Sequence, residues 1–378
     1  MFKYMEIVEW VKDQITGRGL APGDRFDSEH ELCRELGASR QTVRQALEVL
    51  RRDGVVSSRR GSGTFVTKND FSGRGGGRAR GKTVGVISTY FSDYIFPHIV
   101  SGVERVLTEN EVTMRLAVTN NMVSEEARAL RSMLDQNVAG LIVEPSKSAL
   151  PNPNVGLYDE VRRREIPLVF FNAAYPWSSF PRVAMDDVAA GRLATEHLLS
   201  LGHEKIAGIF LLDDLQGHDR YKGFLESQGD GGQAENRVLW FSNREKATLF
   251  SLSAERVAAL IDSCSAAVCY NDAIALGLYE FCRGRGMGVP DDLSVIGIDD
   301  SRLATICAVP LTSVRHPHQK LGERVAEELL AALGSSSAGK DGYLFEPTLV
   351  ERASTGPPAA LGGRSGQLAG QLASQLAR

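Results

Sequence analysis

The apolar positions of the first 70 residues recur at helical spacing and then change to a short ribbon pattern. Three helices are predicted, over residues 4–15, 29–36 and 40–53, because each stretch keeps its apolar side chains on one face. A serine precedes the second and the third helix, and a glycine follows each of them, as helix caps require. Two short apolar strands then flank a turn rich in arginine and glycine at residues 59–63. The front of the chain is therefore predicted to be a helix-turn-helix followed by a two-stranded ribbon.

Between residues 83 and 352, short continuous apolar strands alternate with amphipathic helices. This alternation predicts an α/β fold with parallel sheets that helices cover on both faces. We expect two lobes with a cleft between them, and chain crossings near residues 185–188 and 300–318. The predicted strands cover 84–88, 113–119, 140–144, 167–171, 205–212, 266–270 and 294–298, and the predicted helices cover 97–110, 124–137, 156–165, 187–201, 218–227, 252–262, 272–285 and 317–333.

Three stretches of low apolar content interrupt this pattern. Residues 71–82, FSGRGGGRARGK, are predicted to be a flexible basic linker, because nothing in them can pack a core. Residues 229–236 are predicted to be a polar surface loop, and residues 353–378 a disordered tail. The expected organisation is a DNA-binding domain over 1–70, the linker, a two-lobed domain over 83–352, and the tail.

Charge is distributed unevenly along the chain. The 378 residues carry a formal net charge of −4, which by itself argues against a nucleic-acid partner. Residues 1–82 nevertheless hold 16 basic and 11 acidic side chains, a net charge of +5, and the remainder holds 27 and 36, a net charge of −9. A basic front on an acidic body predicts that one end meets a polyanion.

Several classes of protein receive no support from the sequence. No run of 18 apolar residues and no signal-peptide core occur, so we expect a cytoplasmic protein without a membrane span. The five cysteines form no CxxC pair, and the histidines show no metal-ligand spacing, so neither a disulfide framework nor a metal site is expected. Neither GxSxG nor HExxH occurs, so hydrolase chemistry is not indicated, and no cofactor is expected.

The third predicted helix carries the residue types that read DNA bases. Arginine can hold guanine by two hydrogen bonds, and glutamine can pair with adenine. Hydroxyls at a helix start suit phosphate oxygens. The alternative is a small helical domain with a solvated charged face, but six arginines between residues 40 and 60 against two acids favour DNA. The candidates from this pattern are Ser39, Arg40, Gln41, Thr42, Arg44, Gln45, Arg59 and Arg60.

The segment EHELCRELGASRQTVRQALEVLRRDGVVSSRRGSGTFV resembles the winged helix-turn-helix of GntR-type regulators, over about residues 3–67. The resemblance implies that Arg40 and Arg44 read bases and that Arg60 reaches the minor groove or a phosphate. It implies supporting contacts from Lys3, Glu29, Gly61, Ser62, Gly63 and Thr64. One departure is visible: Phe26-Asp27-Ser28-Glu29 replaces the usual Leu-Pro-Ser-Glu, so Asp27 can compete with Ser28 as the helix cap.

Residues 83–352 resemble the periplasmic-binding-protein-like body of LacI-type repressors. The matching pieces, in the expected order, are TVGVIS, GLIVEP, GRLATEHLLSLGHEKIAGI, DRYKGF, CYNDAIALGL and VPDDLSVIGIDDS. The combination of this body with a GntR-type head is similar to the arabinose operon repressors of Gram-positive bacteria. The resemblance implies a homodimer, with the helices at 97–110 and 124–137 as a candidate dimer face.

Polar and aromatic side chains follow many of the predicted strands, where a sugar would meet hydrogen-bonding groups and apolar walls. By resemblance, Arg220 clamps the sugar, Asp299 binds it and Asn271 lines its pocket. Purely structural roles remain open for several residues. Asp272 can cap helix 272–285, and Asp186 can cap helix 187–201. Glu144 and Lys147 can form an exposed ion pair, and Tyr90 and Phe96 can belong to the core of a lobe. The candidate sugar-binding residues are Tyr90, Tyr94, Phe96, Glu144, Lys147, Asn172, Gln216, His218, Arg220, Asn271 and Asp299.

These features together predict a repressor of sugar-utilisation genes that a small sugar releases from double-stranded operator DNA. The resemblance implies L-arabinose as that sugar. Another pentose, a hexose or a nucleoside stays open as the effector, because pocket side chains do not fix which epimer fits. A sugar-modifying enzyme or the sugar-binding component of a transporter are remote alternatives.

Overall fold

The computed structural model describes residues 3–52, 54–59, 63–67, 83–91, 94–229, 234–334 and 342–358. The chain divides into two compact units, residues 1–79 and 80–378. Within the described residues, no helix has both the length and the apolar character that a bilayer crossing needs. The predicted linker at 71–82 lies outside the described residues, so that boundary stays a prediction.

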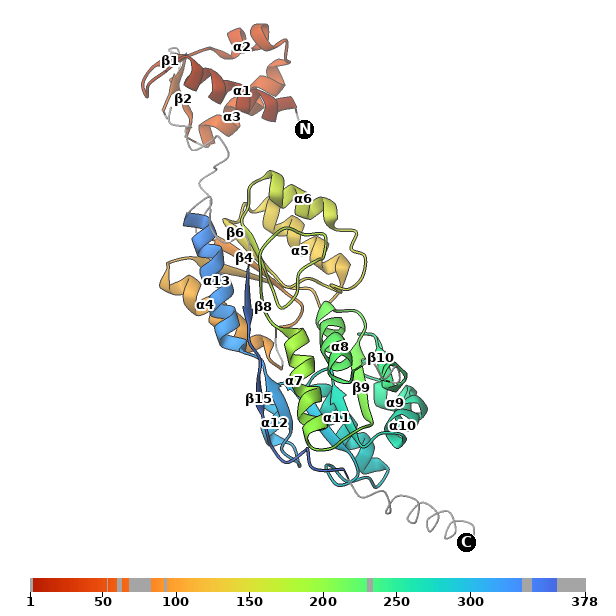
Figure 1. The fold of residues 1–378 in the computed structure, drawn as a ribbon. Coiled ribbons are helices and arrows are strands. Elements are labelled where there is room, and N and C mark those ends of the chain that lie inside the picture. Colours follow the sequence, from red (N-terminus) through yellow and green to blue (C-terminus); the bar gives the residue numbers. More distant parts are fainter. Residues whose placement is uncertain are drawn as a thin grey trace. The chain divides into compact units, whose positions relative to one another are not determined.

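The first unit packs three helices against a small antiparallel sheet (Figure 1). The helices are α1 (Lys3–Gly17), α2 (Glu29–Leu36) and α3 (Arg40–Arg52). The strands β2 (Val56–Arg59) and β3 (Gly63–Val66) form the predicted ribbon, and β1 (Arg25–Phe26) adds a third strand that the sequence did not predict. The predicted apolar stripes of the helices meet in one core, which includes Val11, Ile15, Leu32, Val43, Leu47 and Leu50.

The second unit consists of two lobes, each built on a six-stranded sheet (Figure 1). The sheet of the first lobe has the order β14-β8-β7-β6-β4-β5, and all its neighbouring strands are parallel. Its strands are β4 (Thr83–Ser88), β5 (Thr113–Val118), β6 (Gly140–Val143), β7 (Leu168–Phe171), β8 (Arg182–Met185) and β14 (Tyr343–Phe345), and its helices are α4 (Phe96–Glu109), α5 (Val123–Asp135), α6 (Val155–Arg163) and α13 (His318–Gly334).

The sheet of the second lobe has the order β10-β9-β11-β12-β13-β15, and only its β13–β15 pair is antiparallel. Its strands are β9 (Ile206–Leu211), β10 (Val238–Phe241), β11 (Ala266–Cys269), β12 (Ser294–Asp299), β13 (Thr312–Arg315) and β15 (Thr348–Val350). Its helices are α7 (Asp187–Ser200), α8 (Leu215–Ser227), α9 (Leu249–Leu252), α10 (Ala254–Asp262), α11 (Asp272–Gly284) and α12 (Leu303–Ile306), with a 3₁₀ turn at Glu235–Arg237.

The chain passes between the lobes at three points. It crosses between β8 and α7 and between β13 and α13, where two crossings are predicted, and again between β14 and β15. The third crossing was missed because its two strands have three residues each, too few to show a period.

The predicted start of the disordered tail at residue 353 is wrong. Ser354 is fully buried, donates through its Oγ to the carbonyl of Val295 at 2.6 Å and accepts from the amide of Thr312 at 2.8 Å. Gly356 accepts a hydrogen bond at 2.8 Å from the His203 ring. Residues 353–358 are therefore part of the second lobe, because their polar groups have partners there, and residues 359–378 lie outside the described residues.

The helices α7 and α8 approach each other closely through two glycines. A Cβ on Gly191 of α7 would lie 2.0 Å from the Arg220 carbonyl oxygen, and one on Gly223 of α8 would lie 2.0 Å from that of Val188. Because neither position leaves room for a side chain, α7 and α8 pack backbone against backbone. This packing places Arg220 of α8 beside Asp187, the first residue of α7.

Candidate functional site

The recognition helix α3 presents the predicted base-reading residues to solvent. Arg40, Gln41, Arg44 and Gln45 are all exposed, while the apolar stripe of the same helix is buried. Among the described residues, the ion pair that involves this group joins Arg44 Nε to Glu48 at 3.6 Å, one turn further along. An exposed pair of this kind contributes little, so the arginine can exchange it for a base or a phosphate.

Hydroxyls and carboxylates fix the starts of α2 and α3. Ser28 caps α2 in a complete capping box with Glu31, and Glu29 is the first residue of that helix. The open question about Asp27 is settled, because its carboxylate accepts from Arg18 at 2.6 Å instead of capping. At α3, Ser39 Oγ accepts from the Thr42 amide and lies 2.8 Å from the Thr42 hydroxyl.

The structure describes only part of the predicted ribbon tip. Gly63 has a φ of +110°, which favours glycine. Thr64 is 5% exposed and pairs with both neighbouring strands, so its supporting role in DNA contacts stays a prediction. Arg60, Gly61 and Ser62, and the side chains of Lys3 and Arg59, lie outside the described residues.

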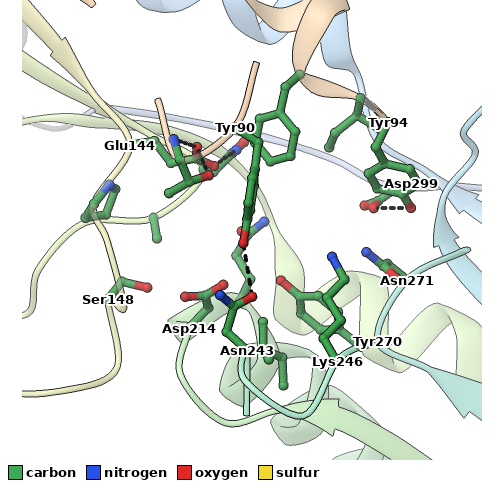
Figure 2. Close-up of a pocket in the computed structure, with 18 of the residues that line it drawn as sticks. Tyr90, Tyr94, Glu144, Ser148, Asp214, Asn243, Lys246, Tyr270, Asn271 and Asp299 are labelled. Carbon is green, nitrogen blue, oxygen red and sulfur yellow. Dashed lines mark hydrogen bonds between the residues drawn. The ribbon is translucent and has the colours of Figure 1, made fainter. Parts of the chain in front are cut away.

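A cavity lies between the two lobes of the second unit, with about 640 Å³ of empty space including its mouth (Figure 2). Side chains from loops that follow strands of both sheets line it, as expected for this class of fold. The predicted residues that line it are Tyr90, Tyr94, Phe96, Glu144, Asn172, Gln216, Arg220, Asn271 and Asp299. Three of them depart from ordinary backbone geometry: Tyr94 and Asn172 have a φ of +62°, and Asp299 has a φ of +114°. Strain of this kind persists where the surrounding structure fixes a functional geometry.

Arg220 is the buried cation at the floor of this cavity. Its side chain is 2% exposed, and it donates from Nε to Asp187 at 2.8 Å, from Nη1 to the Tyr270 carbonyl at 2.6 Å and from Nη2 to Asp299 at 3.4 Å. Burial opposes its charge, but the carboxylates of Asp187 and Asp299 outweigh burial and raise the pKa of Arg220. The guanidinium also lies over the Tyr270 ring, 4.9 Å from its centroid. Arg220 thus stays charged and holds Asp299 in place.

Glu144 is a buried carboxylate fixed by its own lobe. One oxygen accepts from the Thr89 amide at 2.8 Å, from the Thr89 hydroxyl and from Ser88, and the other accepts from Asn172 at 2.6 Å. Burial raises the pKa of Glu144, although these hydrogen bonds oppose the shift. The side chain is 6% exposed, so it is not half of an exposed ion pair with Lys147.

Two tyrosines of the first lobe reach across the cavity to the second (Figure 2). The Tyr94 hydroxyl donates to Asp299 at 2.6 Å and accepts from the Asp272 amide at 3.2 Å. The Tyr90 hydroxyl donates to Asn243 at 3.0 Å. Burial, followed by the nearby charges of Asp299 and Asp272, raises the pKa of Tyr94 well above its usual value. The ring centroids of Tyr90 and Phe96 lie 5.4 Å apart, and both side chains line the cavity, while Phe96 also packs against the core of the first lobe.

Two predicted residues do not line the cavity. Lys147 turns toward the second lobe, where its Nζ lies 3.7 Å from Asp213. His218 lies on the outer side of α8, with its Nε2 2.8 Å from the Leu212 carbonyl oxygen and its ring beside Trp240. Position after a strand predicted the neighbourhood correctly, but the side chains of these two residues point elsewhere.

The sequence missed several cavity residues and one cap. Asn243 and Lys246 follow β10, a strand that was not predicted, so no strand end pointed to them. The other missed lining residues are Thr89, Ile95, Pro145, Ser148, Ala173, Leu211, Asp214 and Tyr270. Asn271, not Asp272, caps α11 through a 3.1 Å hydrogen bond from the Ile274 amide, while Asp186 caps α7 as one alternative had it.

Residues 76–83, GGRARGKT, match the spacing of a phosphate-binding loop. That motif needs a helix directly after its lysine. Thr83 instead begins strand β4, and residues 76–82 lie outside the described residues. The match therefore carries no functional argument.

Two known families each match a segment of one structural unit. Residues 3–66 match the family of bacterial regulatory proteins of the gntR type, and residues 195–355 match the periplasmic-binding-protein-like domain. A solved LacI-family regulator from Enterococcus faecium, with bound ribose, is 24% identical and has a TM-score of 0.61. It covers 73% of this chain and 99% of its own, which shows that the second unit has the same fold.

Two curated relatives match nearly the whole chain. The arabinose metabolism transcriptional repressor of Geobacillus stearothermophilus is 39% identical, with 93% of this chain and 97% of the relative covered. The protein of the same name from Halalkalibacterium halodurans is 36% identical, with 93% and 96% covered. The relatives are transcriptional regulators and not enzymes. The chain, a DNA-binding regulator with a sugar-sensing body, therefore belongs to the family of arabinose metabolism transcriptional repressors.

Proposed function

We propose that this repressor holds L-arabinose in the cavity between its lobes and that the sugar releases it from operator DNA. The observation that carries the proposal is the cavity itself, where Arg220 and Asp299 from one lobe face Glu144 and Asn172 from the other. A pyranose with four hydroxyls needs donors and acceptors on both sides and an aromatic wall, and the names of the two relatives favour arabinose.

The proposed sugar contacts follow from the free hydrogen-bonding capacity at the cavity surface. Arg220 has five N–H donors, of which the protein uses three, so two remain for ring or hydroxyl oxygens. Asn172 Oδ1 is buried and has no partner within the described residues, which makes it an acceptor for a sugar hydroxyl. Tyr90 and Phe96 supply the apolar wall for the C–H face of the ring. We add Asp214, Asn243 and Lys246 to the proposed sugar-binding residues and remove Lys147 and His218 from them.

On the DNA side, Arg40 and Arg44 would read bases in the major groove, flanked by Gln41 and Gln45. The exposed start of α3 at Ser39 and Thr42 would lie against a phosphate. We propose a homodimer, because two such heads match two half-sites of an operator. A protein that acts on bacterial operator DNA works in the cytoplasm.

Sugar occupancy would favour one angle between the lobes, because its contacts come from both. Thermodynamic linkage then requires that sugar weaken operator binding by the same factor by which operator weakens sugar binding. This reciprocity holds whatever path the signal takes between the two units.

The test combines calorimetry with a mobility-shift assay on the full chain. Pentoses and hexoses are titrated singly, and each is then added to the operator complex. We expect L-arabinose to bind most tightly and to release the operator. Indifference to every monosaccharide, or an equal sugar affinity with and without saturating operator, would overturn the proposal. A different preferred pentose, hexose or nucleoside would keep the mechanism and replace the effector.

A further inference from the structure

Two carboxylates face the cavity from opposite lobes (Figure 2). Glu144 follows β6 of the first lobe and is fixed there by its hydrogen bonds. Asp214 precedes α8 of the second lobe, and its Oδ1 accepts from Asn121 of the first lobe at 3.4 Å. The two acids therefore share one cavity between the lobes.

Asp214 does not perform the local role that its position offers. It occupies the N-cap of α8, yet its side chain makes no cap hydrogen bond. Ser148 of the first lobe accepts from the amide of Leu215, the first residue of the helix, at 2.9 Å. Since an aspartate at an N-cap normally accepts a hydrogen bond from the first turn of its helix, a side chain that lines the cavity instead points to another use.

The charges around Asp214 leave it short of positive partners. Asp213 is already paired with Lys147, and the Tyr270 ring adds no charge. Lys246 is exposed, lies over the Tyr90 ring at 5.8 Å and opposes the shift only weakly. Burial, followed by the charge of Glu144, raises the pKa of Asp214 to about 7. Around the whole cavity, the basic Arg220 and Lys246 face three acids, Glu144, Asp214 and Asp299.

We propose that Glu144 and Asp214 form a facing carboxylate pair that admits uncharged polyhydroxyl ligands, rejects anionic ones and makes ligand binding take up a proton. The inference rests on the proposed sugar site and adds a statement of which ligands that site admits. Sugar hydroxyls can donate to both acids, whereas a phosphate or carboxylate group would add a further negative charge. Arg220 cannot offset that charge, because Asp187 and Asp299 already neutralise it.

The direction of the pH dependence follows from the pKa of Asp214. In this structure, burial and the charge of Glu144 raise the pKa of Asp214 from 3.8 to about 7. We infer that opening of the cleft would hydrate this carboxyl and return its pKa toward the ordinary value. The closed form therefore binds more protons between these values. Binding that closes the cleft strengthens as pH falls through 7 and loses this contribution as pH rises above 7, by about tenfold between pH 6 and pH 8.

The experiment is calorimetry of the full chain with L-arabinose at pH 6, 7 and 8, in buffers that differ in ionisation enthalpy. We expect about tenfold tighter binding at pH 6 than at pH 8 and uptake of about half a proton at pH 7. Asp214→Asn should abolish both. Asp213→Asn is the matched control, because its neighbouring carboxylate does not line the cavity, and it should keep both effects.

Inorganic phosphate, added at 50 mM against sodium chloride of equal ionic strength, tests anion rejection. We expect no competition with L-arabinose in the wild-type protein. Competition by phosphate, a pH-independent wild-type affinity, or unchanged pH dependence in Asp214→Asn would overturn the inference. If Asp214→Asn fails to fold, the proton uptake of the wild type decides. Absence of any L-arabinose binding would instead overturn the arabinose assignment on which the inference rests.

Discussion

Arg44 and Arg220 are the same residue type in opposite settings. The Arg44 side chain is 71% exposed and has one weak partner within its own helix, whereas Arg220 is 2% exposed and donates three hydrogen bonds inside its lobe. The exposed arginine keeps its donors for a partner outside the chain. The buried arginine uses most of its donors to fix the walls of a cavity before any partner arrives. Loss of the first should affect one binding event, and loss of the second should affect binding and folding together.

The largest expected effect is that of Arg220→Ala. The change leaves Asp187 and Asp299 buried without their cation, so the free energy of unfolding should fall by about 3–5 kcal/mol. Sugar binding should be lost, and the folded protein should bind operator with or without sugar. Denaturant unfolding, calorimetry and a mobility-shift assay measure these three quantities.

Arg192→Ala is the control for this change. Arg192 lies on α7, is exposed and pairs with Glu226 at 2.6 Å, so its removal should leave stability and sugar response nearly unchanged. A normal sugar response in Arg220→Ala would show that the buried arginine does not hold the ligand.

The next effect tests the packing that positions Arg220. In Gly223→Ala, the new methyl group would meet the Val188 carbonyl oxygen at 2.0 Å and the Arg192 amide nitrogen at 2.6 Å. The two helices must separate, which should cost about 1–3 kcal/mol of unfolding free energy and weaken sugar binding. Gly156→Ala in α6, where nothing lies within 4 Å, should leave stability unchanged or raise it slightly. Equal stability of the two variants would contradict the close approach.

Arg44→Ala should have the most limited effect, because it changes one binding event and leaves the fold unchanged. Operator binding should weaken by about 1–3 kcal/mol while sugar binding and stability stay the same. Arg44→Lys keeps the charge but loses the two-pronged donor geometry, so it should recover non-specific binding more than specific binding. Equal loss of affinity for operator and for unrelated DNA would show that Arg44 contacts a phosphate and not a base.

The two settings also differ in how far the sequence predicts them. The helix period alone places Arg44 on the outer face of α3, and Ser28 with Glu31 fixes the start of α2, because both depend on neighbours within one turn. The surroundings of Arg220 depend on α7, β11 and β12, which are distant in sequence. The resemblance to LacI-type repressors predicted Arg220 as a sugar-binding residue, and the hydrophobic period of the chain did not.

A short edge strand explains two of the cavity residues that the sequence did not predict. The strand β10 has four residues and follows a polar loop, so neither it nor the cavity residues Asn243 and Lys246 behind it were predicted. Asp214 was missed for another reason: an aspartate before a helix is ordinarily a cap, and only the fold shows that its side chain makes no cap hydrogen bond and lines the cavity. Lys147 and His218 were predicted to line the cavity and do not, because position after a strand does not fix the direction of a side chain.

Because of the third crossing, the last two strands of the described chain belong to different lobes. Within eight residues, β14 completes the edge of one sheet beside β8, and β15 completes the edge of the other beside β13. A premature stop codon just before residue 343 would therefore remove the edge strands β14 and β15, one from each lobe. It would also remove Ser354 from the interior of the second lobe. Nonsense mutations this late in the gene should abolish sugar sensing, even though every residue that lines the cavity is still translated.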